Sequence, residues 1–162
     1  MAKMPEEGRF EYGKMDKNTG AQWVHVTPEM ARAHPQGRLN ALLWVIVAAF
    51  AALGAIKVYL SLTYGGTGLL VGGVVELLTA LMLAMRAPWG VWLAGAQLLV
   101  SVFGLVTGGV LKELALTETE IGLAILAYFV FLVLALFYLV EGERPNLIYR
   151  HRFRSYRRAN KE

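Results

Sequence analysis

The sequence predicts an all-α membrane protein whose core is a bundle of four transmembrane helices. Of its 162 residues, 56% are hydrophobic, and the mean hydropathy of +0.47 exceeds what a soluble domain usually carries. Nearly all charged residues lie before Asn40, after Val140 or in short breaks between apolar runs. This segregation of charge indicates that the apolar runs lie in lipid.

Four apolar runs give the predicted spans. They cover about residues 39–63, 68–86, 89–112 and 121–140. Each is about 18 to 25 residues long, and at about 1.5 Å per residue this length matches a hydrocarbon core of about 30 Å. A soluble bundle is disfavoured because none of the runs carries the polar stripe of a helix that faces water. An arrangement with three spans is the other alternative.

The distribution of Lys and Arg predicts the orientation of the bundle. The break that holds Arg86 is expected in the cytoplasm, and the uncharged turn 64–67 and the acidic loop 117–120 are expected outside. The basic C-terminal tail then falls inside, so both termini are cytoplasmic. Trp44 and Trp89 agree, because they would lie at the cytoplasmic interface, where tryptophan is enriched.

The polar N-terminal segment, residues 1–38, is expected to lie in the cytoplasm. Residues 10–12 and 22–26 alternate in the manner of strands around a turn at 16–20, which predicts a small hairpin. Two strands alone are marginal in water, so the hairpin needs a partner or the membrane surface. A short helix is expected over 28–34, where Pro stands at the first helical position.

The C-terminal segment, residues 141–162, is a basic cytoplasmic tail. A helix after Pro145 would place Tyr149, Phe153 and Tyr156 on one face, as in an interfacial helix that lies on a membrane. The alternative is an ordinary positive tail. Five arginines are expected to contact the anionic headgroups of the inner leaflet: Arg150, Arg152, Arg154, Arg157 and Arg158. Binding to nucleic acid is not expected.

Lys57 and Glu76 are the charged residues that lie well inside the predicted spans. Counted from the turn between the first two spans, they lie at similar depth, and each is the other's obvious partner. Gln97 and Tyr128 lie within reach of the same depth in the third and fourth spans. These four residues predict a polar cluster inside the bundle. Its role is either a proton or ion relay with substrate contacts, or interhelical hydrogen bonding that fixes the packing.

Two pairs of glycines have the spacing at which helix backbones approach closely, Gly68 with Gly72 and Gly104 with Gly108. We interpret them as sites of helix packing within the chain. The alternative is that glycine is simply common in membrane helices.

Several kinds of chemistry are disfavoured by the sequence. The chain has no cysteine, which excludes disulfides, thiolate nucleophiles and cysteine-bound zinc. The three histidines, His25, His34 and His151, lie outside the spans, so a haem held by two histidines within the bilayer is not expected. No cofactor and no metal are expected.

We therefore expect a non-enzymatic small integral membrane protein, an accessory or scaffold subunit that associates with other membrane-protein subunits of a larger complex. The alternative is a small transporter, or a transporter subunit, that uses the intramembrane pair of Glu76 and Lys57. The four-span plan resembles many small prokaryotic membrane proteins in size and topology, without a motif specific to one family. The expected location is the cytoplasmic (inner) membrane of a prokaryote.

Overall fold

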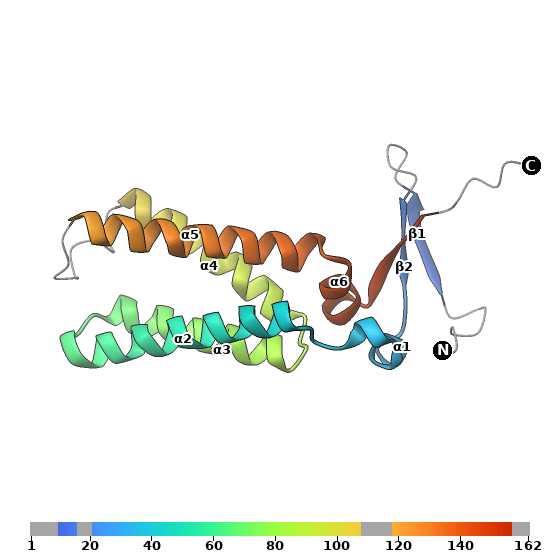
Figure 1. The fold of residues 1–162 in the computed structure, drawn as a ribbon, viewed down its shortest axis with the longest axis horizontal. Coiled ribbons are helices and arrows are strands. Elements are labelled where there is room, and N and C mark those ends of the chain that lie inside the picture. The colour runs from blue at the N-terminus through green and yellow to red at the C-terminus, as the bar shows by residue number, and fades with distance from the viewer. Residues whose placement is uncertain (1–9, 16–20, 108–117, 157–162) are drawn as a thin grey trace, which may run out of the picture.

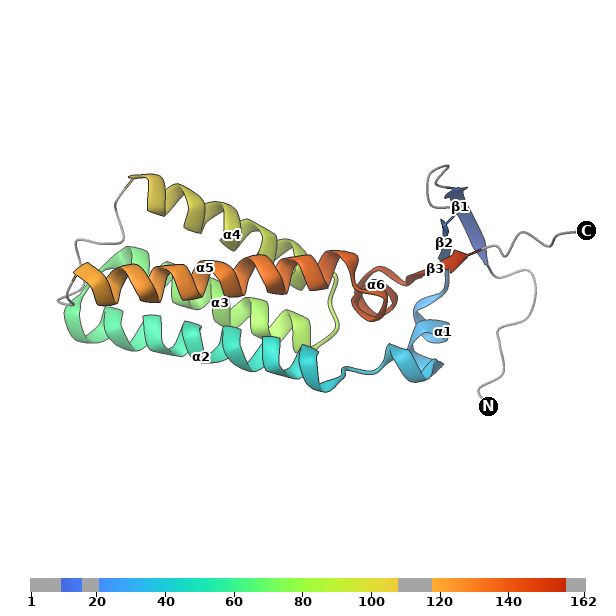
Figure 2. The same cartoon turned by 45° about the horizontal axis from the view of Figure 1, so that its top comes forward.

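The structure is a computed structural model that describes residues 10–15, 21–107 and 118–156. The described part of the chain is mostly helical, and four long helices lie along one axis (Figures 1 and 2). These are α2 (Ala41–Tyr64), α3 (Thr67–Ala84), α4 (Trp89–Thr107) and α5 (Glu118–Glu141). At one end of them stand the short helices α1 and α6 and a small β-sheet.

The first two long helices form an antiparallel pair joined by a turn of two glycines. Asn40 caps α2, because its side chain accepts a hydrogen bond of 3.0 Å from the backbone N–H of Leu43. The helix ends where Gly65 and Gly66 take φ values of 83° and 105°, which favour glycine. Ser61 donates a hydrogen bond of 2.8 Å to the carbonyl of Gly66 and holds the turn closed.

Among the residues that the structure describes, two helical segments are long and apolar enough to cross a membrane. They are Pro35–Tyr64 and Thr67–Ala84 and correspond to the first two predicted spans. A third candidate span results if two consecutive helices count as one, Ile125–Glu141 and Glu143–Arg150. The chain bends by 71° between them. The described apolar part of α4 is shorter, and the predicted span 89–112 continues into residues outside the described ranges.

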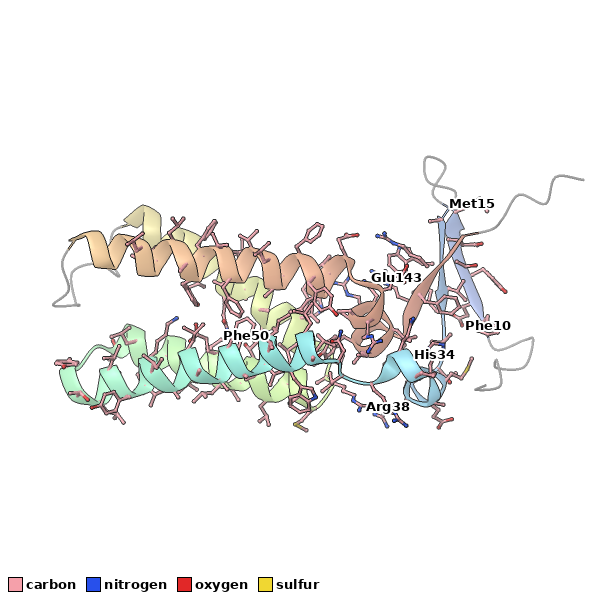
Figure 3. The ribbon with its side chains drawn as sticks, in the orientation of Figure 1. Phe10, Met15, His34, Arg38, Phe50 and Glu143 are labelled. Atoms are coloured by element: carbon pink, nitrogen blue, oxygen red, sulfur yellow. The ribbon has the colours of Figure 1, made fainter. Side chains whose placement is uncertain are left out.

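The core of the bundle is apolar and lies at the end that bears the sheet. Phe50 on α2 is fully buried and packs edge to face against Phe131 on α5, with ring centroids 5.3 Å apart (Figure 3). The other fully buried residues of this core come from all four long helices and from α6; they include Leu43, Leu83, Ala94, Leu132, Leu139 and Tyr149.

The two ends of the described chain fold together into one sheet. Its strands are β1 (Glu11–Met15), β2 (Ala21–His25) and β3 (Arg152–Tyr156), antiparallel in the order β1-β2-β3. The predicted hairpin is thus present, and the partner that it needs is a strand from the other end of the sequence. α1 (Pro28–Ala33) and the 3-10 turn η1 (Pro35–Gly37) connect β2 to the bundle.

The interfacial helix, one of the two interpretations of the C-terminal segment, does not form, because the helix around Pro145 ends at Arg150. Pro145 lies inside α6 (Glu143–Arg150), and the chain then turns at His151 and continues as strand β3. Tyr149 is 1% exposed within the protein, so it does not lie on lipid. Phe153 lies opposite Val24 of β2 in the sheet. A strand is favoured here because β2 supplies hydrogen-bond partners for the backbone of the tail.

Gly68 and Gly72, which the sequence analysis interpreted as sites of helix packing, do not mark the closest approach of α2 and α3. A Cβ atom added to Gly68 would have no neighbour within 4 Å, and one added to Gly72 would meet only the Lys57 side chain at 4.0 Å. The close approach of α2 and α3 instead occurs at Gly54 and Gly73. A Cβ atom on either would lie 2.8 Å from the backbone oxygen of the other, so only glycine allows this separation of the helices.

This geometry predicts opposite effects for alanine at two glycines of α3. Gly73→Ala should lower the free energy of unfolding by about 1–3 kcal/mol, because its methyl group overlaps backbone atoms of α2 that cannot move independently. Gly68→Ala is the matched control and should be neutral or stabilising by up to about 1 kcal/mol. Unfolding in detergent by titration with dodecyl sulfate measures both, and equal effects would contradict the assigned crossing point.

Candidate functional site

The candidate site is a polar cluster in which three long helices meet. The Lys57 Nζ on α2 lies 2.6 Å from the Glu76 Oε1 on α3, and the Tyr128 hydroxyl on α5 donates to the same oxygen at 2.5 Å. The Lys57 Nζ also lies 3.1 Å from the Tyr128 hydroxyl oxygen. The structure therefore brings together three of the four residues that the sequence predicted for this cluster.

The two charged partners differ in their access to the surroundings. The side chain of Glu76 is 1% exposed, whereas that of Lys57 is 26% exposed. An ionised carboxylate in such a position requires a cationic partner and hydrogen-bond donors, and Lys57 and Tyr128 supply them on one oxygen. The other oxygen, Oε2, is buried and has no hydrogen-bond partner among the described residues.

Gln97, the fourth predicted member, lies beside the cluster without bonding to Glu76. Its Nε2 donates a hydrogen bond of 2.6 Å to the Thr79 hydroxyl, which in turn donates to the carbonyl of Val75 at 2.8 Å. The Oε1 of Gln97 is buried and lacks a partner among the described residues. Gln97 thus binds α3 at Thr79, three residues and about one helical turn after Glu76.

Sequence reasoning missed two residues of this site, Thr79 and Ser101. Thr79 is buried and stands three residues after Glu76, so a helix places both on one face. Ser101 on α4 lies near the Tyr128 hydroxyl and stands four residues after Gln97. A search for hydroxyl residues at helical spacing from the charged and amide residues would have found both.

Gly72 borders the cluster, since it lies against the aliphatic stem of Lys57. Gly104 lies near the end of α4, and Gly108 lies outside the described residues. The packing predicted for these two glycines stays a prediction.

The arginines predicted to contact lipid have different surroundings. Arg152 lies 4.2 Å from the ring centroid of Trp23 and donates a hydrogen bond of 3.0 Å to Asn146. Arg154 lies 4.8 Å from the same ring and forms an ion pair with Glu141 at 2.5 Å. These two arginines therefore make contacts within the protein.

The remaining arginines of that set are Arg150, which is partly buried at the end of α6, and Arg157 and Arg158, which lie outside the described residues. Lipid contact by these three stays a prediction. In the described part of the chain, no three His, Asp or Glu side chains gather as they would to hold a metal ion.

No protein-family model matches this chain, and no curated protein or solved structure matches it either. The class that the described residues define is a helical protein with two or three apolar helices that could cross a membrane. In this protein the polar cluster of Lys57, Glu76 and Tyr128 joins α2, α3 and α5.

The burial of Glu76 predicts unequal costs for removing the two charges. Lys57→Met should lower the free energy of unfolding by at least about 2 kcal/mol, because it leaves a buried carboxylate without its cation. Glu76→Gln should cost less, since the partly exposed ammonium of Lys57 can turn outward. Unfolding in detergent measures both single variants and the double variant.

In the double variant the two costs should not add, because the second substitution removes the charge that the first left unpaired. Tyr128→Phe is the control that removes a hydrogen bond to the carboxylate without changing a charge, and it should cost about 1.5–3 kcal/mol. Additive effects of Lys57→Met and Glu76→Gln would show that the pair contributes no coupling to the stability of the bundle.

Proposed function

We propose that this chain is a non-enzymatic accessory or scaffold subunit of a larger membrane complex. In this proposal all four long helices cross the inner membrane of a prokaryote, and both ends of the chain lie in the cytoplasm. The observation that carries it is the small folded unit at one end of the bundle, which is built from both tails (Figures 1 and 2).

The surface of the bundle supports the membrane part of the proposal. Large apolar side chains face outward on every long helix, for example Leu62 at 76%, Leu99 at 72% and Phe137 at 67% exposure. Trp44 and Trp89 are also exposed, at 53% and 70%, and lie in the first turns of α2 and α4. Their position at the end that bears the sheet fits an aromatic belt at a membrane interface.

Hydrogen bonds hold the folded unit in a defined position on the bundle. The hydroxyl of Tyr149 on α6 donates to the carbonyl of Leu83 on α3 at 2.9 Å. Asn146 is fully buried and donates to the carbonyls of Val140 and Gly142 at 2.6 and 2.8 Å. Since these buried groups fix the angle between α5 and α6, the sheet is oriented relative to the membrane, as a docking platform requires.

The strand order supplies a surface for a partner. β1 lies at one edge of the sheet; Figure 3 labels Phe10, the residue before this strand, and Met15 at its end. An edge strand offers backbone N–H and C=O groups to a strand of another protein. Tyr12 at 67% and Met15 at 44% exposure add apolar contact area to this edge. We therefore assign β1 as the contact surface for the other subunit.

The scaffold proposal predicts a stoichiometric partner in affinity purification from native membranes in a mild detergent. Tyr12→Lys should abolish the association, because it removes an exposed aromatic side chain from the sheet edge. Gln36→Lys is the control, since it adds the same charge at an exposed position of η1. A chain that purifies alone at every detergent concentration tested would overturn the proposal.

Transport is the second candidate, and it is favoured by the Glu76 Oε2, which has no hydrogen-bond partner among the described residues. The buried Glu76 Oε2 and the buried Gln97 Oε1, which likewise has no partner in the described part of the chain, are two acceptors that a proton or a small cation can use. On this proposal Glu76 and Lys57 contact the transported species.

Proteoliposomes that contain a pH-sensitive dye test the transport candidate for protons. Glu76→Gln should abolish proton flux while the protein stays folded, and Gln97→Glu should retain it. Loss of folding in Glu76→Gln, or the absence of flux in the unmodified protein for protons and for sodium, would leave the cluster with a structural role.

A further inference from the structure

A small depression, partly open to solvent, lies where the bundle meets the sheet-bearing unit. Segments far apart in the sequence surround it: α1 and η1, the break between α3 and α4, and the end of α6. Its lining residues are Ala31, Arg32, Gly37, Arg86, Ile148 and His151. Three of these six residues, Arg32, Arg86 and His151, are basic, and none is acidic. The described residues thus place two arginines and a histidine around one concave surface.

The backbone at two of these residues is unusual. Arg86 and His151, with φ values of 60° and 49°, are the non-glycine residues with positive φ in the described part of the chain. Arg86 follows α3 at the position where glycine usually ends a helix, and the N–H of Ala87 bonds to the carbonyl of Met82 at 2.8 Å. A side chain there costs about 1–2 kcal/mol relative to glycine. Because strained backbone conformations cluster at functional sites, we infer a functional role for the basic side chains of Arg86 and His151.

The electrostatics of the depression favour an anion. Burial, together with the charge of the nearby Arg32, lowers the pKa of His151 below its usual value. In the described part of the chain, neither Arg32 nor Arg86 forms an ion pair. Arg86 also lies near Tyr149, where burial raises the pKa of the hydroxyl, so this neighbour supplies no negative charge at neutral pH. Like charges that converge without a carboxylate are stabilised when an anion lies between them.

The depression lies at the depth of lipid headgroups if the bundle spans the membrane. Arg86 stands two residues after the end of α3 at Ala84 and three before the start of α4 at Trp89. The exposed Trp44 and Trp89 lie at the same end of the bundle, and such residues usually sit among the headgroups. Three of the segments that line the depression, α1, η1 and α6, belong to the folded unit at this end of the long helices.

We propose that Arg32, Arg86 and His151 form a binding site for a phosphate group. The site takes either the headgroup phosphate of an anionic lipid or a free phosphate from the cytoplasm. Arg86 and Arg32 supply fixed positive charge and several N–H donors, and His151 supplies a further ring N–H. This inference rests on the membrane insertion proposed above, and it assigns lipid recognition to residues other than the arginines of the C-terminal tail.

The test uses the full chain reconstituted in nanodiscs of phosphatidylcholine, with and without phosphatidylglycerol, and native mass spectrometry to count the bound lipid. Phosphatidylglycerol should bind in preference to phosphatidylcholine, and Arg86→Gln should weaken this preference about fivefold. Arg32→Gln should weaken the preference to a similar extent. Since Arg32 lies on α1 and Arg86 lies between α3 and α4, a local folding defect at one of them would not explain equal losses in both variants. Arg38→Gln is the matched control, because Arg38 is exposed on the linker before α2 and does not line the depression (Figure 3).

The two sources of phosphate are distinguished by adding inorganic phosphate to the protein in detergent without lipid. A shift of the His151 ring signals in the NMR spectrum that is lost in Arg86→Gln would assign a site for free phosphate. Lipid preference without this shift would assign a headgroup site. Equal losses in Arg86→Gln and Arg38→Gln, or no preference for phosphatidylglycerol and no shift with phosphate, would overturn the site. Failure of the chain to insert into nanodiscs would instead overturn the membrane proposal.

Discussion

The face of α3 that carries Glu76, Thr79 and Leu83 is the feature on which the rest of the structure depends. Glu76 binds Lys57 of α2 and Tyr128 of α5, Thr79 accepts from Gln97 of α4, and the carbonyl of Leu83 accepts from Tyr149 of α6. If the bundle lies in lipid, as proposed, the hydrophobic effect does not drive its helices to associate, so polar bonds and close packing hold them together. Each neighbouring helix is bound to α3 through this one face.

The polar partners could be predicted from sequence because depth in a membrane follows from residue counts. Lys57 and Glu76 lie at similar distances from the turn at Gly65 and Gly66, and the structure joins them at 2.6 Å. The packing glycines could not be predicted in this way. Spacing shows that Gly68 and Gly72 share a face of the helix, but not that this face meets α2. Gly54 and Gly73 lack a partner at that spacing, and only their approach in space identifies them.

The sheet shows a different limit of sequence reasoning. The hairpin of β1 and β2 is local, so alternation and a turn predict it. β3 pairs with β2 across almost the whole chain, from Gln22 to Ser155, and no local pattern specifies such a partner. The tail did carry a strand signal, since Arg152, Phe153 and Arg154 alternate polar and apolar. The spacing of Tyr149 and Phe153 fits a helix as well, and the helix hypothesis overlooked the alternation.

The same helix face also links the two ends of the molecule. α3 carries the buried carboxylate of Glu76 near its middle, accepts the Tyr149 bond near its end and is followed by Arg86 at the depression. The contacts in the bundle and those at the sheet therefore share one rigid element. A rotation of α3 by one side-chain position would break the bonds at Glu76, Thr79 and Leu83 together, so the cluster and the folded unit must keep one arrangement or change jointly.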